Sequence, residues 1–145
     1  MKSSKRFPPL LAAAATLVFV GCAKAEAPPV KVASHACMGP ATTVTVFVDS
    51  DGKTNNKVVY VCEGKDSVDW VAADEKAFVS DDIGWKNGES PFSERPAHVT
   101  HGNRKVLHSK PPKAGTARHS FDYDAWLVLP DGSKIKIDPR IEVMD

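Results

Sequence analysis

Hydrophobic and polar residues alternate along most of the chain beyond position 40, which is the period of a β-strand with one face in a core. The first such run is Thr42–Asp49, and a second run, Lys57–Cys62, follows an Asp-Gly turn signal. Because this turn is typical of a hairpin, we expect the two runs to pair and to bring Cys62 close to the start of the first run.

Further short runs follow the same pattern. The run Ser67–Ala72 predicts a strand, although Ser67 is also a suitable helix cap and leaves a short helix as the alternative. The stretches "AHVTH" and "RKVLHS" predict two strands on either side of the turn "HGN", while residues 80–95 are rich in turn-forming residues. These segments add several short strands and no clear helix.

The last third of the chain has the most regular alternation. Apolar residues occupy the odd-numbered positions from Phe121 to Leu129, and again from Ile135 to Val143, on both sides of Pro139. A face that continues past a proline indicates an edge strand or a bulge at that point. In total, six to eight short strands with almost no helical periodicity predict one all-β domain over residues 40–145, an antiparallel sandwich or a small barrel.

The first 21 residues have the parts of an export signal. Lys2, Lys5 and Arg6 are followed by an apolar run, Leu10–Val20, of about eleven residues, which is too short to span a bilayer. The stretch "FVGC" that follows resembles the lipobox of bacterial lipoproteins. This resemblance implies that residues 1–21 are a cleaved signal peptide and that Cys22 becomes the lipidated first residue, carrying diacylglycerol and a further acyl chain such as palmitate.

The match to the lipobox has one departure, since Phe19 stands where the pattern usually has leucine. The alternative is an ordinary cleaved signal peptide with its cleavage site near residues 23–25. With a lipid anchor, Ala23 after the cysteine implies sorting to the outer membrane, facing the periplasm. Residues 22–39 are rich in alanine and proline, and we expect them to form the lipidated N-terminus and a short flexible tether.

Charge excludes one class of partner. Without residues 1–21 the chain has 16 basic and 18 acidic residues, so it is not globally basic, and we expect no binding to nucleic acid.

The three cysteines are an odd number for an exported protein. If Cys22 is lipidated, Cys37 and Cys62 remain as a pair in an oxidising compartment, for which a disulfide is the default. The alternative is a two-cysteine metal or redox site, but the spacing matches neither CxxC nor a zinc knuckle.

Three stretches resemble the cupredoxin family. These are "GKDSVDWV", "PPKAGTARHSFDYDAWL" and "DPRIEV". The stretch "FVSDDIGWKNGESPF" is in addition similar to small lipoproteins of this general build whose role is unassigned. The resemblance covers roughly residues 40–144 and implies a Greek-key β-sandwich. A blue-copper site requires two histidines, a thiolate and an axial methionine, and the loop "PDGSKIKIDP" before the last strand has none of them. We therefore expect no type 1 copper centre and no resident cofactor.

Four of the five histidines fall within a short stretch of the chain. His98 and His108 share parity across the "HGN" turn, and we expect them to meet as a cross-strand pair. The candidate ligands for Cu(II) or Zn(II) are His98, His101, His108 and His119. A periplasmic copper- or zinc-binding protein is therefore the alternative function, and surface histidines in a polar strand are the simpler explanation.

Charges are segregated along the sequence. Residues 63–94 contain nine acids and three lysines, whereas residues 95–118 contain six bases and no acid. The positive electrostatic field of residues 95–118 attracts an anionic partner, such as lipid head groups, a cell-wall polymer or an acidic protein face. The alternative is that the two segments are neighbours and neutralise each other locally. The candidate partner-binding residues are the six bases, together with Trp126 on the polar face of its strand: Arg95, Arg104, Lys105, Lys110, Lys113, Arg118 and Trp126.

Recognisable catalytic motifs are missing from the sequence, which contains no GxSxG, no HExxH and no glycine-rich phosphate loop. We therefore expect a protein that is not an enzyme. The sequence favours an envelope-anchored lipoprotein that acts as a non-catalytic binding or structural module, with a membrane and an envelope protein or anionic polymer as its partners.

Overall fold

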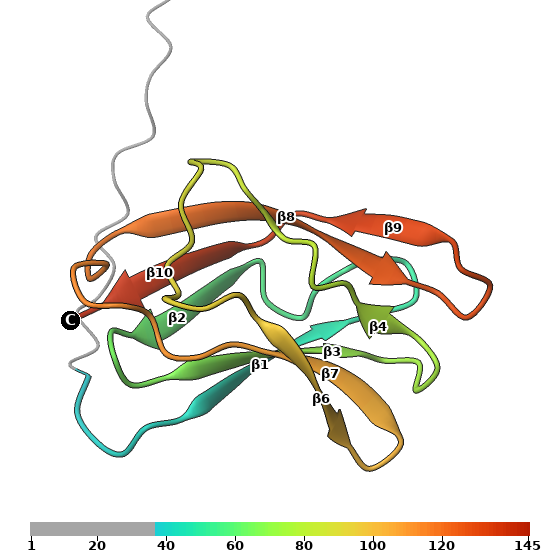
Figure 1. Ribbon diagram of the computed structural model, residues 1–145, viewed down its shortest axis with the longest axis horizontal. Coiled ribbons are helices and arrows are strands. Elements are labelled where there is room, and N and C mark those ends of the chain that lie inside the picture. The colour runs from blue at the N-terminus through green and yellow to red at the C-terminus, as the bar shows by residue number, and fades with distance from the viewer. Residues whose placement is uncertain (1–36) are drawn as a thin grey trace, which may run out of the picture. The chain divides into compact units, whose positions relative to one another are not determined.

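The computed structural model describes residues 37–145, which form ten strands and no helix (Figure 1). The predicted signal peptide, the predicted lipidation site Cys22 and most of the predicted tether lie outside the described residues. No helix among residues 37–145 is long and apolar enough to cross a membrane. The strands are β1 (Thr43–Val48), β2 (Val58–Cys62), β3 (Ser67–Ala72), β4 (Phe78–Val79), β5 (Gly84–Trp85), β6 (Ala97–His101), β7 (Arg104–His108), β8 (Ser120–Val128), β9 (Lys134–Ile137) and β10 (Arg140–Met144).

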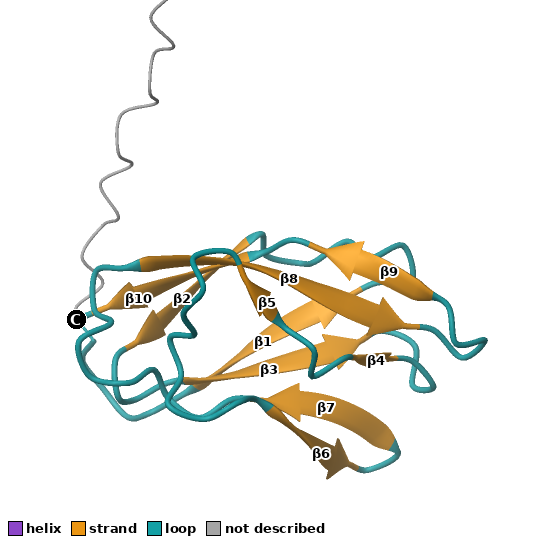
Figure 2. Ribbon diagram, turned by 45° about the horizontal axis from the view of Figure 1, so that its top comes forward, coloured by secondary structure: helices purple, strands orange, loops and turns teal. Residues whose placement is uncertain are grey.

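The strands form two sheets that lie one above the other (Figure 1 and Figure 2). The smaller sheet has the order β1-β3-β7-β6, and the larger has the order β2-β10-β8-β4, with β5 and β9 also paired to β8. The all-β prediction is therefore confirmed, and Ser67–Ala72 is a strand rather than a helix. The prediction of purely antiparallel sheets is wrong, because β1 runs parallel to β3 and β2 runs parallel to β10.

The predicted β1–β2 hairpin is also wrong. The turn after β1 does form, with Gly52 N–H donating to Asp49 O at 3.0 Å, but the chain then crosses to the other sheet. Gly52 has a φ of +79°, and a Cβ built on it would lie 2.5 Å from Ile135 Cγ2, so this turn packs directly against β9. A local turn signal therefore marks a crossover between sheets.

The predicted disulfide between Cys37 and Cys62 is present, with a Cα–Cα distance of 5.7 Å. It joins the start of the described chain to the end of β2, and a buried carboxylate reinforces the same junction. Asp66 accepts hydrogen bonds from Thr42 N–H at 2.9 Å, from the Thr42 hydroxyl at 3.0 Å and from Cys62 N–H at 2.9 Å. The entry of the chain into the domain is thus fixed covalently and by hydrogen bonds.

The core between the sheets is built from the inward rows of both. Its centre is aromatic: Trp70 on β3 lies edge-on to Tyr123 on β8 and to Phe92, with ring centroids 6.0 and 6.3 Å apart. Valine side chains from β1, β2, β3, β4 and β10 surround this centre and are almost completely buried. Hydrophobic and polar residues alternate in the sequence because each strand turns one of its faces toward this core.

Strand β8 is the central strand of the larger sheet, since β4, β5, β9 and β10 all pair with it. Strands β9 and β10 both pair with it in one continuous register, with Ala125 opposite Ile137 and Arg140 opposite Asp122. Pro139 interrupts the ladder without shifting it, and its carbonyl accepts a hydrogen bond from Tyr123 N–H at 3.3 Å. This break explains why the apolar parity continues past the proline.

Candidate functional site

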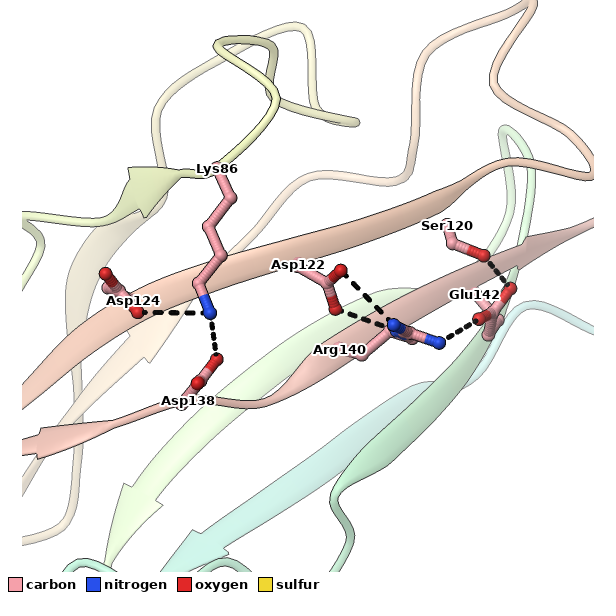
Figure 3. A network of polar contacts seen from close by, with 7 residues as sticks. All are labelled: Lys86, Ser120, Asp122, Asp124, Asp138, Arg140 and Glu142. Carbon is pink, nitrogen blue, oxygen red and sulfur yellow. Dashed lines mark hydrogen bonds and ion pairs between the residues drawn. The ribbon is translucent and has the colours of Figure 1, made fainter. Parts of the chain in front are cut away.

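The outward side of the larger sheet carries a dense set of charged side chains, which we call the charged face (Figure 3). Side chains on β8, β9 and β10 alternate between core and solvent, so the even-numbered residues of these strands all point outward. A lysine that follows β5 completes the set. The charged face comprises Lys86, Ser120, Asp122, Asp124, Lys136, Asp138, Arg140 and Glu142.

Lys86 directly follows β5 and reaches across β8 to Asp138. Its Nζ lies 2.6 Å from Asp138 Oδ1 and 3.6 Å from Asp124 Oδ1, while Lys136 Nζ lies 2.9 Å from Asp124 Oδ2. The hydrogen bond to Asp138 raises the pKa of Lys86, and the hydrogen bond from Lys136 lowers the pKa of Asp124. The Lys86 ammonium and the Asp124 carboxylate therefore stay ionised over the whole neutral range.

Arg140 organises the other half of the charged face. It donates from Nε to Asp122 Oδ1 at 2.7 Å and from Nη2 to Asp122 Oδ2 at 3.2 Å, a two-pronged pair that fixes the plane of the guanidinium. The hydrogen bond from Arg140 lowers the pKa of Asp122. Glu142 lies 3.8 Å from Arg140 Nη1 and accepts a hydrogen bond of 2.6 Å from the Ser120 hydroxyl.

Two aromatic side chains flank the charged face. Trp126 lies opposite Lys136 on the outer surface, half-buried and on the same side as Asp122 and Asp124, where its parity places it. Tyr60 on the edge strand β2 lies opposite Glu142 and is 45% exposed. Tyr60 is not among the residues predicted from the sequence, although the buried valines on either side of it place it on the outward face.

The histidines do not form the predicted cross-strand pair. The two-residue turn after β6 pairs His101 with Arg104, so that His98 lies opposite Leu107 and His108 lies opposite Ala97. In such a hairpin, an even-numbered residue of β6 lies opposite an odd-numbered residue of β7. Two even-numbered residues on the two strands, such as His98 and His108, therefore face opposite sides of the sheet, which is why the prediction was wrong.

Each of the two rings has its own partner. The Nε2 of His98 points inward and donates to Val79 O on the larger sheet at 2.8 Å. The Nδ1 of His108 points outward and lies 2.6 Å from Asp69 Oδ1. His119 lies next to Phe121 at the other end of β8 from the β8–β9 turn. Within residues 37–145 no three His, Cys, Asp or Glu side chains come together as a metal site.

Four of the six bases of segment 95–118 have separate partners of their own. Arg95 lies 3.9 Å from Asp81 and 4.0 Å from Asp82, and Arg104 lies 3.6 Å from Glu75, so these two bases neutralise acids of segment 63–94. Lys105 lies 4.0 Å from the centre of the Phe78 ring, and Arg118 pairs with Asp145. Lys110 and Lys113 lie in the connection between β7 and β8. The local-neutralisation alternative therefore holds for Arg95 and Arg104.

Comparison with known proteins gives no family. No family model matches the chain, and no curated protein matches it either. The charged face and the sequence signals before the domain are therefore the features of the chain that bear on its function.

Proposed function

We propose that the protein is an envelope-anchored lipoprotein that acts as a non-catalytic binding or structural module. Its partner binds to the charged face. In this proposal Cys22 carries the lipid anchor at the outer membrane, facing the periplasm, and the domain is a Greek-key sandwich of cupredoxin-like build without blue-copper ligands. The lipobox resemblance, the export signal and the disulfide support this location, since structural disulfides persist in oxidising compartments.

The single observation that carries the binding role is the preorganisation of the charged face. Its charges lie on β8, β9 and β10, at Lys86 after β5 and at Asp138 between β9 and β10. Ion pairs join Lys86 to Asp138 and Asp122 to Arg140 (Figure 3), and a further pair joins Lys136 to Asp124. Arg140 lies among them, and Trp126 and Tyr60 flank them; these are the residue types that dominate the binding energy of protein interfaces. Side chains fixed before binding lose little entropy when a partner arrives.

The signs of the charges select the kind of partner. Four carboxylates and three cations are interspersed over the charged face, so a polyanion meets repulsion from the carboxylates beside each cation. A protein surface offers both signs and complements such a pattern. We therefore commit to an envelope protein as the partner, rather than to lipid head groups or a cell-wall polymer.

The test is capture of a partner from envelope extracts by the tagged, lipidated full chain. In a swap variant, Asp122→Arg with Arg140→Asp, the internal pair is kept while both charges that a partner meets are inverted. We expect this variant to keep its melting temperature and to capture at least about tenfold less partner, since like charges across an interface cost several kcal/mol.

A second swap serves as the matched control. The pair Arg118 and Asp145 is also exposed but lies at the end of the domain where the chain enters. The variant Arg118→Asp with Asp145→Arg should capture the partner as well as the unchanged protein does. Failure to capture any discrete protein at any salt concentration, or equal capture by both swap variants, contradicts the proposal.

A further inference from the structure

A depression of about 320 Å³ opens beside the edge strand β5, between residues 81–85 and the segment that leads into β6. Its volume is at the lower end of the range for ligand sites, about 300–1,000 Å³, which fits one ring of a ligand rather than a large cofactor. Its apolar floor consists of Ile83, Trp85, Phe92 and Pro96, and none of the residues that line it belongs to the charged face.

Trp85 is held firmly as part of this floor. Strand β5 pairs it with Tyr123 of the central strand β8, and its ring lies 5.0 Å from the Tyr123 ring and 5.9 Å from the Phe92 ring. Tyr123 and Phe92 are themselves buried in the core, whereas Trp85 is half-exposed. The depression therefore offers a rigid aromatic platform, which costs little entropy to use.

The rim of the depression carries both donors and acceptors of hydrogen bonds. The Ser90 hydroxyl oxygen accepts Phe92 N–H at 3.1 Å, which leaves its own hydrogen free to donate. Arg95 donates from Nε to Asp81 O at 3.0 Å, which holds its guanidinium at the rim, and the carboxylate of Glu94 is exposed beside it. An apolar floor is thus surrounded by fixed polar groups of mixed type.

This combination selects among ligand classes. Two carboxylates, Asp81 and Glu94, and one guanidinium, Arg95, lie together at the depression, so an ion of either sign meets a like charge as well as an opposite one. A purely apolar ligand leaves all the rim groups without hydrogen bonds. A sugar ring has an apolar C–H face that stacks on an indole, and hydroxyls around it that both donate and accept. We propose that the depression at Trp85 binds a neutral sugar residue of a polysaccharide, as a second site apart from the charged face.

The experiment titrates the full chain, purified in detergent, with cellohexaose and chitohexaose as neutral probes. The chain has three tryptophans, so the indole N–H resonances separate the site from the core and from the charged face. We expect a saturable shift of the Trp85 resonance and none of Trp126. The probe hexamers of glucosamine and of galacturonic acid test the cationic and anionic alternatives.

Variants separate binding from folding. Trp85→Ala should weaken binding of the neutral probe by at least about tenfold. Because Trp85 also packs on the core, Glu94→Gln is the second variant: Glu94 is exposed, so this change should leave the melting temperature unchanged and weaken binding severalfold. Trp126→Phe is the control and should bind the probe normally.

Three results would overturn the proposal: no saturable shift with either neutral hexamer, a response only to a charged hexamer, or a shift confined to Trp126. None of them bears on the capture of a protein by the charged face. Conversely, a swap variant at Asp122 and Arg140 should still bind the sugar, so the two proposals fail independently.

Discussion

The indole Nε1 of Trp70 donates a hydrogen bond of 2.7 Å to the hydroxyl of Tyr123, and both side chains are completely buried. Trp70 is on β3 of the smaller sheet and Tyr123 is on β8 of the larger, so this bond ties the two layers together at the centre of the core. Burial raises the pKa of Tyr123, and its hydroxyl therefore stays neutral throughout the physiological pH range.

Tyr123→Phe removes the acceptor and leaves the indole N–H of Trp70 buried without a partner. We expect the free energy of unfolding to fall by about 1–3 kcal/mol, the cost of an unsatisfied buried donor. Urea denaturation measures this change. Tyr60→Phe is the matched control, because Tyr60 is 45% exposed, and it should change the stability by less than about 0.5 kcal/mol. Equal effects of the two variants would contradict the role of the bond.

Asp66→Asn weakens the junction at which the chain enters the domain. Asp66 is only 7% exposed, and its carboxylate accepts three hydrogen bonds from Thr42 and Cys62. An amide replaces one of its oxygens with a donor, so we expect a loss of about 1.5–3 kcal/mol in the free energy of unfolding. Asp51→Asn, in an exposed turn, is the control and should be close to neutral.

The same residue makes stability depend on pH. Burial acts to raise the pKa of Asp66, but the hydrogen bonds from Thr42 and Cys62 outweigh it and hold the pKa below its ordinary value. The contribution of Asp66 is therefore fully present above the unfolded-state pKa of about 3.9 and is lost as the pH falls through the lower folded-state value. Urea titrations between pH 6 and pH 2 should show a shallower decline for Asp66→Asn; an identical decline would contradict this assignment.

Cys37→Ser with Cys62→Ser opens a loop whose ends are 25 residues apart. Constraint of the unfolded chain by such a loop contributes about 3.5 kcal/mol, so we expect a stability loss of about that size. Thermal melting with and without reductant measures the effect. Cys22→Ser should leave the melting temperature unchanged, since that cysteine precedes the disulfide-closed loop; a large loss there would assign it a role in folding.

His98→Ala opens the side of the molecule where β6 meets β4. The residue donates to Val79 O at 2.8 Å, and its ring lies edge-on to Phe78 with centroids 5.5 Å apart. We expect a loss of about 1 kcal/mol in stability and faster amide exchange in β4. His101→Ala, in the exposed end of the same strand, should change neither quantity, and a comparable loss there would show that the inter-sheet bond is unimportant.

The sequence predicts where the strands lie but not how they pair. Alternation depends only on which face of a strand is buried, and it locates β1, β2, β3, β8 and the halves of the β9–β10 ladder. Pairing depends on contacts between distant segments, which local turn signals do not contain. The Asp-Gly turn at Gly52 precedes a crossover, and the turn at Gly102 sets a register that separates His98 from His108. The two-residue strands β4 and β5 are too short to produce a periodic signal.

The candidate site was predictable only in part, for the same reason. The parity of β8 places Trp126 on the outer face, and the structure agrees. The charged face beside it includes the contact between Lys86 and Asp138, which are 52 positions apart in the chain, and a single sequence carries no signal of that contact. The six bases of segment 95–118 are close in sequence, which suggested one basic patch. In the structure, Arg95 and Arg104 instead form ion pairs with two different acids.

Photo-crosslinking at matched positions tests the central claim most directly. Tyr60 borders the charged face and is 45% exposed, whereas Phe47 is 50% exposed on the outer face of the smaller sheet. The photoreactive residue benzoylphenylalanine is placed at position 60 or at position 47 of the full-length chain, and crosslinking is done in intact envelopes of the expressing cells. Our account predicts one discrete protein adduct from position 60 and none from position 47. Adducts only from position 47, or from neither position, would contradict it.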